Sequence, residues 1–206
     1  MRKLILLSIF FSALFSQDAL LIGVSDYKLN PLENTINDVN LLEKAFKKKG
    51  WNVTKVSNPS SDKAKQELQS FFKKNKNKNT PLVVYFSGHG FQMLGENYLM
   101  PILNRYDEKN IEKVINKSLS ITEISYFSRN SYGPKIFIID ACRNSPFGNE
   151  TLSPSAGLNS QYANANTLLA YATSPGQFSY DASSSSSNNG PYAESLSKAI
   201  LSSNTF

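Results

Sequence analysis

The chain has 206 residues with 22 Lys and Arg against 16 Asp and Glu, a formal net charge of +6, and a single Cys beside a single His. This length accommodates one domain with a sizeable core, and aliphatic and aromatic side chains are too frequent for a disordered chain. One Cys excludes an internal disulfide framework, and one Cys with one His excludes a zinc site built mainly from these two ligands.

Residues 1–18 predict a cleavable signal peptide. Arg2 and Lys3 give a positive start, residues 4–15 form an apolar run, and small residues surround the expected cleavage point near 16–17. The run is too short to cross a bilayer comfortably. We therefore expect an exported protein, periplasmic or secreted, with no stable membrane anchor after cleavage. A buried strand or helix at 4–15 is the alternative.

The mature chain, residues 19–206, alternates predicted strands and helices. In chain order we expect a strand at 19–24, a helix over 36–46 that Gly50 stops, a strand at 51–57, a helix at 62–74, a buried strand at 81–86, a hairpin at 91–100 around Gly95, a helix at 121–131, strands at 135–139 and 167–172, and a helix at 192–201. This pattern is typical of an α/β domain with a mostly parallel central sheet and helices on both faces. Residues 143–166 and 183–190, rich in Ser and Asn, are expected as loops that frame a site.

The excess of positive charge is not organised as a binding surface. Lysines cluster at 47–49 and 73–78, the ends of two predicted helices, where cations favour the helix dipole and face water. Cleavage of the signal peptide would also remove Arg2 and Lys3. A nucleic-acid surface interleaves aromatic side chains with its basic residues, and these lysine runs do not. We therefore expect no nucleic-acid partner.

Reactive residues directly follow two of the predicted strands. The strand at 81–86 is followed by Ser87-Gly88-His89-Gly90, and the strand at 135–139 by Asp140-Ala141-Cys142-Arg143. If these strands are neighbours, His89 and Cys142 meet at one sheet edge, where an imidazole can activate a thiol that is mostly protonated at neutral pH. The amides of Gly90 and Cys142 are candidate oxyanion donors. The alternative is a buried Cys and a hydrogen-bonded His without catalytic roles.

Several motifs follow one another in an order that is specific as a whole. They are residues 19–27, Asn37-Asp38, Ser87-Gly88-His89-Gly90, residues 95–101, Asp140-Ala141-Cys142-Arg143, residues 169–177 and residues 189–192. Together they resemble the caspase-like cysteine peptidases, and more closely the metacaspase and bacterial orthocaspase branch. The caspase pattern has Gln before Ala-Cys and a His about 50 residues upstream, and this chain keeps the spacing with Asp140 in place of that Gln. The resemblance implies a three-layer caspase-like fold and a thiol protease.

The resemblance also implies roles for individual residues. His89 would be the general base, and Cys142 the nucleophile that forms a thioester acyl-enzyme. Three residues match positions that, in this family, line the pocket for the substrate side chain preceding the cut bond: Asp38, Ser87 and Asp140. Two carboxylates in a narrow pocket would hold Arg or Lys and repel Asp. As alternatives, Thr35-x-x-Asp38 also reads as a helix capping box, and Ser87 as a strand-end cap.

The chain departs from the family pattern in two places. Many relatives carry an acidic residue after the Asn-Tyr-Leu-x-Pro segment, in some serving calcium, where this chain has Ile102-Leu103-Asn104. We therefore expect no metal and no cofactor, and Asp107 and Glu108 are the remaining candidate ligands if calcium is used. Relatives also continue into another strand after the last helix, which predicts either a truncated sequence or a sheet without that edge strand.

The sequence thus predicts an exported, monomeric cysteine endopeptidase that acts on protein or peptide substrates and cuts after Arg or Lys. Residues 144–166 contain no basic residue, so we expect this loop to escape self-cleavage and the chain to remain unsplit. A catalytically silent binding or regulatory module with the same fold is the alternative.

Overall fold

The computed structural model describes residues 17–142, 158, 163–172 and 188–203. Nearly all of the predicted signal peptide, and most of the two predicted loops, lie outside the described residues. Among the residues that are described, no helix has the length and apolar character needed to cross a membrane.

Within the described part of the chain, five parallel strands form the centre of the sheet. Their order across it is β2 (Asn52–Ser57), β1 (Asp18–Gly23), β3 (Leu82–Met93), β6 (Lys135–Cys142) and β7 (Thr167–Tyr171). Every residue of β1 and the first ten residues of β3 are buried. The apolar runs at 19–22 and 82–86 suit this burial, because both faces of a parallel sheet are covered.

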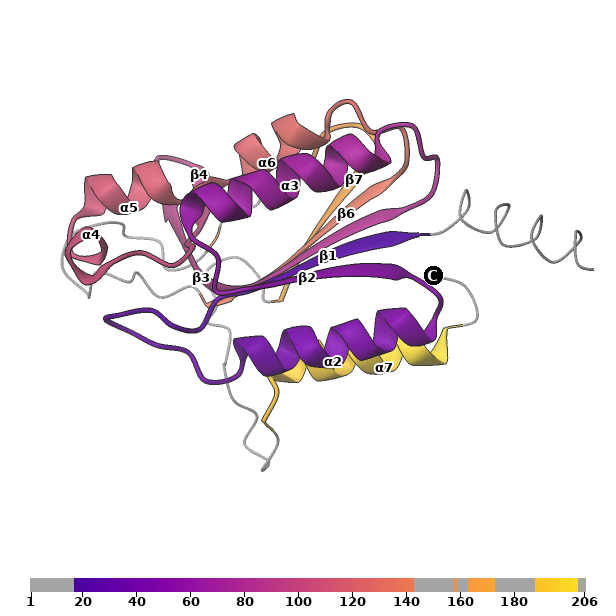
Figure 1. Ribbon diagram of the computed structural model, residues 1–206, viewed down its shortest axis with the longest axis horizontal. Coiled ribbons are helices and arrows are strands. Elements are labelled where there is room, and N and C mark those ends of the chain that lie inside the picture. Colours follow the sequence, from indigo (N-terminus) through magenta and orange to yellow (C-terminus); the bar gives the residue numbers. More distant parts are fainter. Residues whose placement is uncertain (1–16, 143–157, 159–162, 173–187, 204–206) are drawn as a thin grey trace, which may run out of the picture.

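Helices cover both faces of this sheet, so that the domain has three layers. α2 (Thr35–Lys48) and α7 (Pro191–Ser202) lie side by side on one face, and α3 (Ser61–Asn75) and α6 (Ile121–Ser128) lie on the other (Figure 1). Each helix turns its apolar stripe toward the strands. The predicted α/β fold, with a mostly parallel sheet and helices on both faces, is confirmed.

Alternation along each strand divides the core into two clusters. On β3, Val83 and Tyr85 pack in the cluster beneath α2 and α7, whereas Val84 and Phe86 pack in the cluster that includes α3. Successive side chains of a strand point to opposite faces, which produces this division. Tyr85 is thus a phenol placed in an otherwise largely aliphatic layer.

β3 continues beyond the parallel sheet into a small antiparallel extension. Its last residues pair with β4 (Glu96–Leu99), and β4 pairs with β5 (Leu119–Ser120). Leu94 and Gly95 turn the hairpin with φ angles of 51° and 83°, the left-handed conformation of a tight two-residue turn. The predicted hairpin is confirmed, although its first strand belongs to the same long β3 that crosses the sheet.

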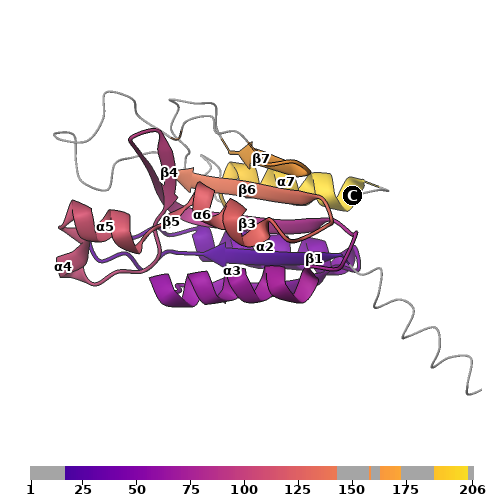
Figure 2. The same ribbon diagram turned by 90° about the horizontal axis from the view of Figure 1, so that it is seen from above.

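Two short helices between β4 and β5 were not predicted. α4 (Arg105–Glu108) and α5 (Ile111–Lys117) each begin after an Asn whose side chain accepts hydrogen bonds from the first turn. Helices of this length show too few turns for an apolar period to be recognised. They lie beyond the carboxyl ends of the parallel strands (Figure 2), the edge at which open α/β sheets bind ligands.

Candidate active site

The adjacent strands β3 and β6 bring the two reactive motifs together. They run parallel, and their register pairs Ser87 with Asp140 and His89 with Cys142. Neighbouring strands lie about 4.8 Å apart, so each pair is separated by about that distance at the backbone. The condition on which the sequence prediction depended, that these strands are neighbours, is therefore met.

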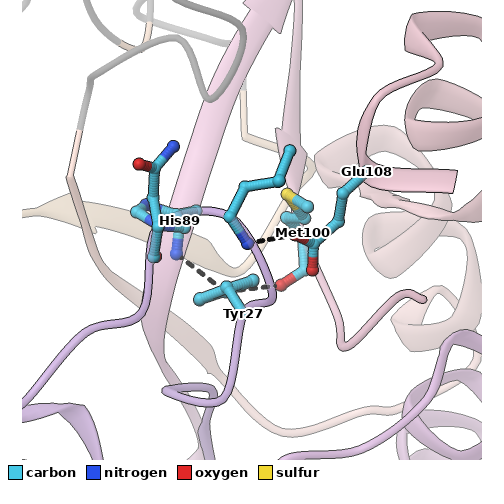
Figure 3. A pocket seen from close by; sticks show the side chains of 6 residues that line it. Tyr27, His89, Met100 and Glu108 are labelled. Carbon is cyan, nitrogen blue, oxygen red and sulfur yellow. Dashed lines mark hydrogen bonds between the residues drawn. The ribbon is translucent and has the colours of Figure 1, made fainter. Parts of the chain in front are cut away.

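Tyr27 holds His89 from the loop that follows β1. The Tyr27 hydroxyl accepts a hydrogen bond of 2.9 Å from the backbone N–H of His89 and donates one of 2.8 Å to the carbonyl of Met100. The two rings lie 4.3 Å apart between centroids, and the His89 side chain is buried. Figure 3 shows Tyr27 between His89 on one side and Met100 on the other. The imidazole is thus fixed by backbone and ring contacts together.

The loop after β1 also determines which nitrogen of the His89 ring carries hydrogen. Nε2 of His89 lies 2.6 Å from the carbonyl oxygen of Asn30. A carbonyl oxygen can only accept, so Nε2 is the donor in this contact. In the neutral ring Nδ1 then carries no hydrogen, and its lone pair can accept a proton, as a general base must.

Two glycines beside His89 allow this close packing. A Cβ on Gly88 would lie 2.6 Å from the Tyr27 hydroxyl oxygen, and a Cβ on Gly90 would lie 2.9 Å from the Cβ of Ala141 on β6. Both separations are shorter than packed carbon and oxygen atoms tolerate. The absence of side chains at these positions therefore lets Tyr27 and β6 approach the strand that carries His89.

An acidic cluster lies next to this pair, two register positions earlier in the sheet. The buried hydroxyl of Tyr85 donates a hydrogen bond of 2.8 Å to Oδ2 of Asp140. Burial raises the pKa of Tyr85 well above its ordinary value, and the negative charges of Asp140 and Asp38 raise it further, while a hydrogen bond with Ser87 opposes this. Burial and Asp140 also raise the pKa of Tyr192. The three predicted pocket residues thus gather around one buried phenol.

Asp38 also performs a structural task that the sequence did not reveal. Its Oδ1 accepts hydrogen bonds from the backbone N–H of Gly190 (2.7 Å) and from Asn189 Nδ2 (3.1 Å), at the start of α7. The alternative prediction of a capping box is wrong, because Asn34 precedes α2 and the Thr35 hydroxyl donates to the carbonyl of Val24. The carboxylate of Asp38 instead lies at the positive end of a different helix.

Comparison with protein families identifies the fold. A family model described as the caspase domain matches residues 17–205, nearly the whole chain. The protein belongs to the caspase-domain family. This family consists of cysteine peptidases, so the resemblance noted in the sequence is confirmed at that level. A search of curated proteins finds no match.

Asp107 and Glu108, the candidate calcium ligands proposed from the sequence, both form other contacts in this caspase domain. Oδ2 of Asp107 accepts from Lys117 Nζ (2.6 Å) and from Asn104 Nδ2 (2.7 Å), and the Lys117 contact lowers the pKa of Asp107. Both carboxylate oxygens of Glu108 accept backbone N–H bonds. Within the described residues, no group of three His, Cys, Asp or Glu side chains could hold a metal ion. Asp107 and Glu108 are therefore engaged with hydrogen-bond donors that a cation would have to displace.

Three residues of the site in this caspase domain had no role assigned from the sequence. Asn30 acts through its backbone carbonyl, so the identity of its side chain gives no signal in the sequence. Tyr27 and Tyr85 each use a buried hydroxyl group. The signal that could have found Tyr85 is its position within a buried apolar strand, since a buried phenol requires a hydrogen-bond partner.

Proposed function

We propose that the protein is a cysteine endopeptidase that hydrolyses peptide bonds after Arg or Lys, with Cys142 as nucleophile and His89 as general base. The observation that carries this proposal is the register of β3 and β6, in which His89 pairs with Cys142 and Ser87 with Asp140. The first pair would bring a base on one strand to the nucleophile carried by the next strand. The second supplies a carboxylate two register positions before the proposed reactive pair.

In the proposed reaction His89 moves protons and Cys142 carries the acyl group. Nδ1 of His89 takes the thiol proton, and the thiolate attacks the carbonyl carbon of the substrate. The backbone N–H groups of Gly90 and Cys142 donate to the oxyanion. When the C–N bond breaks, the leaving amine takes the proton from His89, and a thioester remains. Water, deprotonated by His89, then hydrolyses the thioester, which releases the acid and restores the thiol.

The acidic cluster supports a preference for basic side chains. Asp140 and Asp38 place negative charge around Tyr85, and the phenol is kept neutral by burial and by these same charges. A guanidinium or ammonium group entering beside two carboxylates gains charge-assisted hydrogen bonds, whereas an aspartyl side chain would be repelled. The substitution of Asp140 for the Gln of the caspase pattern is consistent with the metacaspase-like branch.

Peptide reporters test this function directly. The purified protein is expected to release a reporter group from arginyl and lysyl peptides and not from a matched aspartyl peptide. Cys142→Ala is expected to abolish turnover, and Ser145→Ala, which leaves the sole thiol in place, serves as its control. Activity only on the aspartyl peptide, or turnover that survives Cys142→Ala, would refute the proposal.

Thiol labelling separates the enzyme from a catalytically silent module. Cys142 is the sole thiol of the chain, so every labelling event reports on it. An activated thiolate is expected to react with an arginyl electrophile much faster than a free cysteine at the same pH, and His89→Ala should remove that difference. Labelling no faster than free cysteine would favour the silent module.

Export is proposed from the composition of the first 18 residues alone. Expression of the full chain in a cell that has a secretory pathway is expected to yield a protein whose first residue lies near Gln17 or Asp18. N-terminal sequencing of the purified product decides this. A retained Met1 would reject cleavage of a signal peptide.

A further inference from the structure

A buried glutamate lies near His89 and lines the same small cavity. Glu108, the last residue of α4, is 2% exposed. Its Oε1 accepts a hydrogen bond of 2.9 Å from the backbone N–H of Lys28, and its Oε2 accepts one of 2.7 Å from the backbone N–H of Leu29. A carboxylate is rarely buried unless it is paired or hydrogen-bonded, so these two amides account for its burial.

The segment that Glu108 holds is the one that contacts the imidazole. The two amides belong to residues 28 and 29, and the next residue, Asn30, presents the carbonyl oxygen that lies 2.6 Å from Nε2 of His89. Tyr27, the residue before Lys28, packs against the same ring at a tilted angle. The carboxylate thus fixes the backbone between the two groups that orient His89.

The cavity between Glu108 and His89 is too small for any part of a substrate. Six residues line a cavity of about 10 Å³: Tyr27, Leu29, Asn30, His89, Met100 and Glu108. Such a volume holds about one water molecule. Figure 3 shows Glu108 across this cavity from His89, with Tyr27 and Met100 between them. No part of a substrate reaches Glu108 through this cavity, and the contacts of its carboxylate are with the loop that holds the His89 ring.

We propose that Glu108 is a positioning residue for His89, acting through the backbone of residues 28–30. The inference rests on the proposed peptidase function, in which His89 is the base. By holding two consecutive amides, the carboxylate sets the Asn30 carbonyl where it accepts from Nε2, and this keeps the basic lone pair on Nδ1. A displacement of the loop by 1 Å would lengthen that bond beyond hydrogen-bond reach.

Glu108→Gln tests the proposal while preserving the shape of the side chain. The amide retains one accepting oxygen, but its NH2 group faces a backbone N–H that it cannot satisfy. We expect kcat on the arginyl reporter to fall about tenfold to a hundredfold, with KM within about twofold, because a misplaced catalytic group costs turnover more than binding. Glu112→Gln, an exposed glutamate on the next helix, is the matched control and should leave both constants unchanged.

The NMR signals of the imidazole report on the position of the His89 ring independently of catalytic turnover. Because the chain has a single histidine, one ring Nε2–H resonance reports on it in protein labelled with nitrogen-15 histidine. In the wild type we expect this proton to exchange slowly with water, as a hydrogen-bonded buried N–H does. In Glu108→Gln it should exchange faster, and the ring nitrogen shifts should show a mixture of tautomers.

The two readouts distinguish the failure of this inference from the failure of the proposed function. A wild-type protein without peptidase activity would reject the function, while the imidazole signal would still decide whether Glu108 positions the ring. Unchanged imidazole signals and unchanged kcat in a folded Glu108→Gln would overturn the inference. Glu108→Asp, which keeps the charge but shortens its reach by one methylene, is expected to behave as Glu108→Gln does; wild-type behaviour would likewise overturn it.

Discussion

The hydroxyl group of Tyr85 donates a hydrogen bond of 2.8 Å to Oδ2 of Asp140. Tyr85 lies on β3 and is fully buried, while Asp140 lies on β6 at the register position beside Ser87. A buried donor thus constrains the carboxylate that the proposed pocket would present to a basic side chain. Tyr85 thus links the strand that carries His89 to the carboxylate of the proposed pocket by a side-chain hydrogen bond, in addition to the backbone pairing of the two strands.

Tyr85→Phe removes this donor and leaves the ring in place. We expect KM for the arginyl reporter to rise about tenfold, because a hydrogen bond to a charged group contributes about 1.5–3 kcal/mol and part of that is recovered by water. The value of kcat should change much less, since the reacting atoms are untouched. Steady-state kinetics measure both constants, and Tyr132→Phe, an exposed tyrosine, provides the control. An unchanged KM would separate Tyr85 from substrate binding.

The raised pKa of Tyr85 predicts how stability depends on alkaline pH. Above its ordinary value of 10.0 the unfolded chain loses the Tyr85 proton, whereas the folded protein retains it. The unfolded state then binds fewer protons, so the free energy of unfolding falls as pH rises, by at most about 1.4 kcal/mol per pH unit from this one group. Below pH 10 this contribution is fully present.

Urea unfolding between pH 9 and about 11.5 checks this dependence. The free energy of unfolding should fall more steeply for the wild type than for Tyr85→Phe, which has no proton to lose at this position. The other tyrosines contribute equally to both proteins. Parallel curves would show that the Tyr85 hydroxyl titrates alike in the folded and unfolded chain.

Asp38→Ala should destabilise the domain by about 1–3 kcal/mol, because the N–H of Gly190 and the amide of Asn189 lose their acceptor at the start of α7. The midpoint of urea unfolding measures the change. Asp62→Ala removes an exposed acid from the first turn of α3 and should shift stability by no more than about 0.5 kcal/mol. Equal effects of the two changes would contradict a special role for Asp38 at α7.

Gly88→Ala should lower both stability and turnover. The added methyl group would lie 2.6 Å from the Tyr27 hydroxyl oxygen, so Tyr27 must move away from the backbone N–H of His89. Overpacking of this kind costs about 1–3 kcal/mol. Combined with Tyr27→Phe, the loss should be smaller than the sum of the single losses, because the colliding oxygen is absent. Strictly additive effects on unfolding and turnover would exclude this contact as the cause.

The chain should remain in one piece during turnover. Residues 144–166 contain neither Lys nor Arg, so an enzyme specific for basic residues finds no target there. Intact-mass measurement after prolonged incubation at high protein concentration is expected to show no product of cleavage within residues 144–166. A specific cut between Asn144 and Asn166 would contradict either the specificity or the absence of self-processing.

The sequence predicted the strands and the larger helices because their apolar periods are local. The run at 81–86 identified the first part of β3, but the polar and glycine residues from Ser87 to Gly90 gave no sign that the same strand continues to Met93. The neighbouring positions of His89 and Cys142 followed from the two strand ends, once the strands were assumed to be adjacent.

What the sequence could not supply are contacts between distant segments. Asp38 resembled a local helix cap because Thr35 precedes it by three positions, yet its partner Gly190 is 152 residues away. Glu108 was considered only as a calcium ligand, because nothing local indicates that it accepts from the amides of residues 28 and 29. Such pairings depend on the fold as a whole rather than on any period in the chain.

The distance along the chain between Asp38 and Gly190 also orders events in time. A ribosome adds about 5–20 residues per second, so the 152 residues added after Asp38, up to and including Gly190, take roughly 8–30 s to synthesise. During that interval His89 and Cys142 are both made, while the carboxylate of Asp38 has not yet met its donors. The reactive pair is therefore synthesised before the donors that hold Asp38. The acidic cluster beside the pair cannot be held in place until Gly190 has been added.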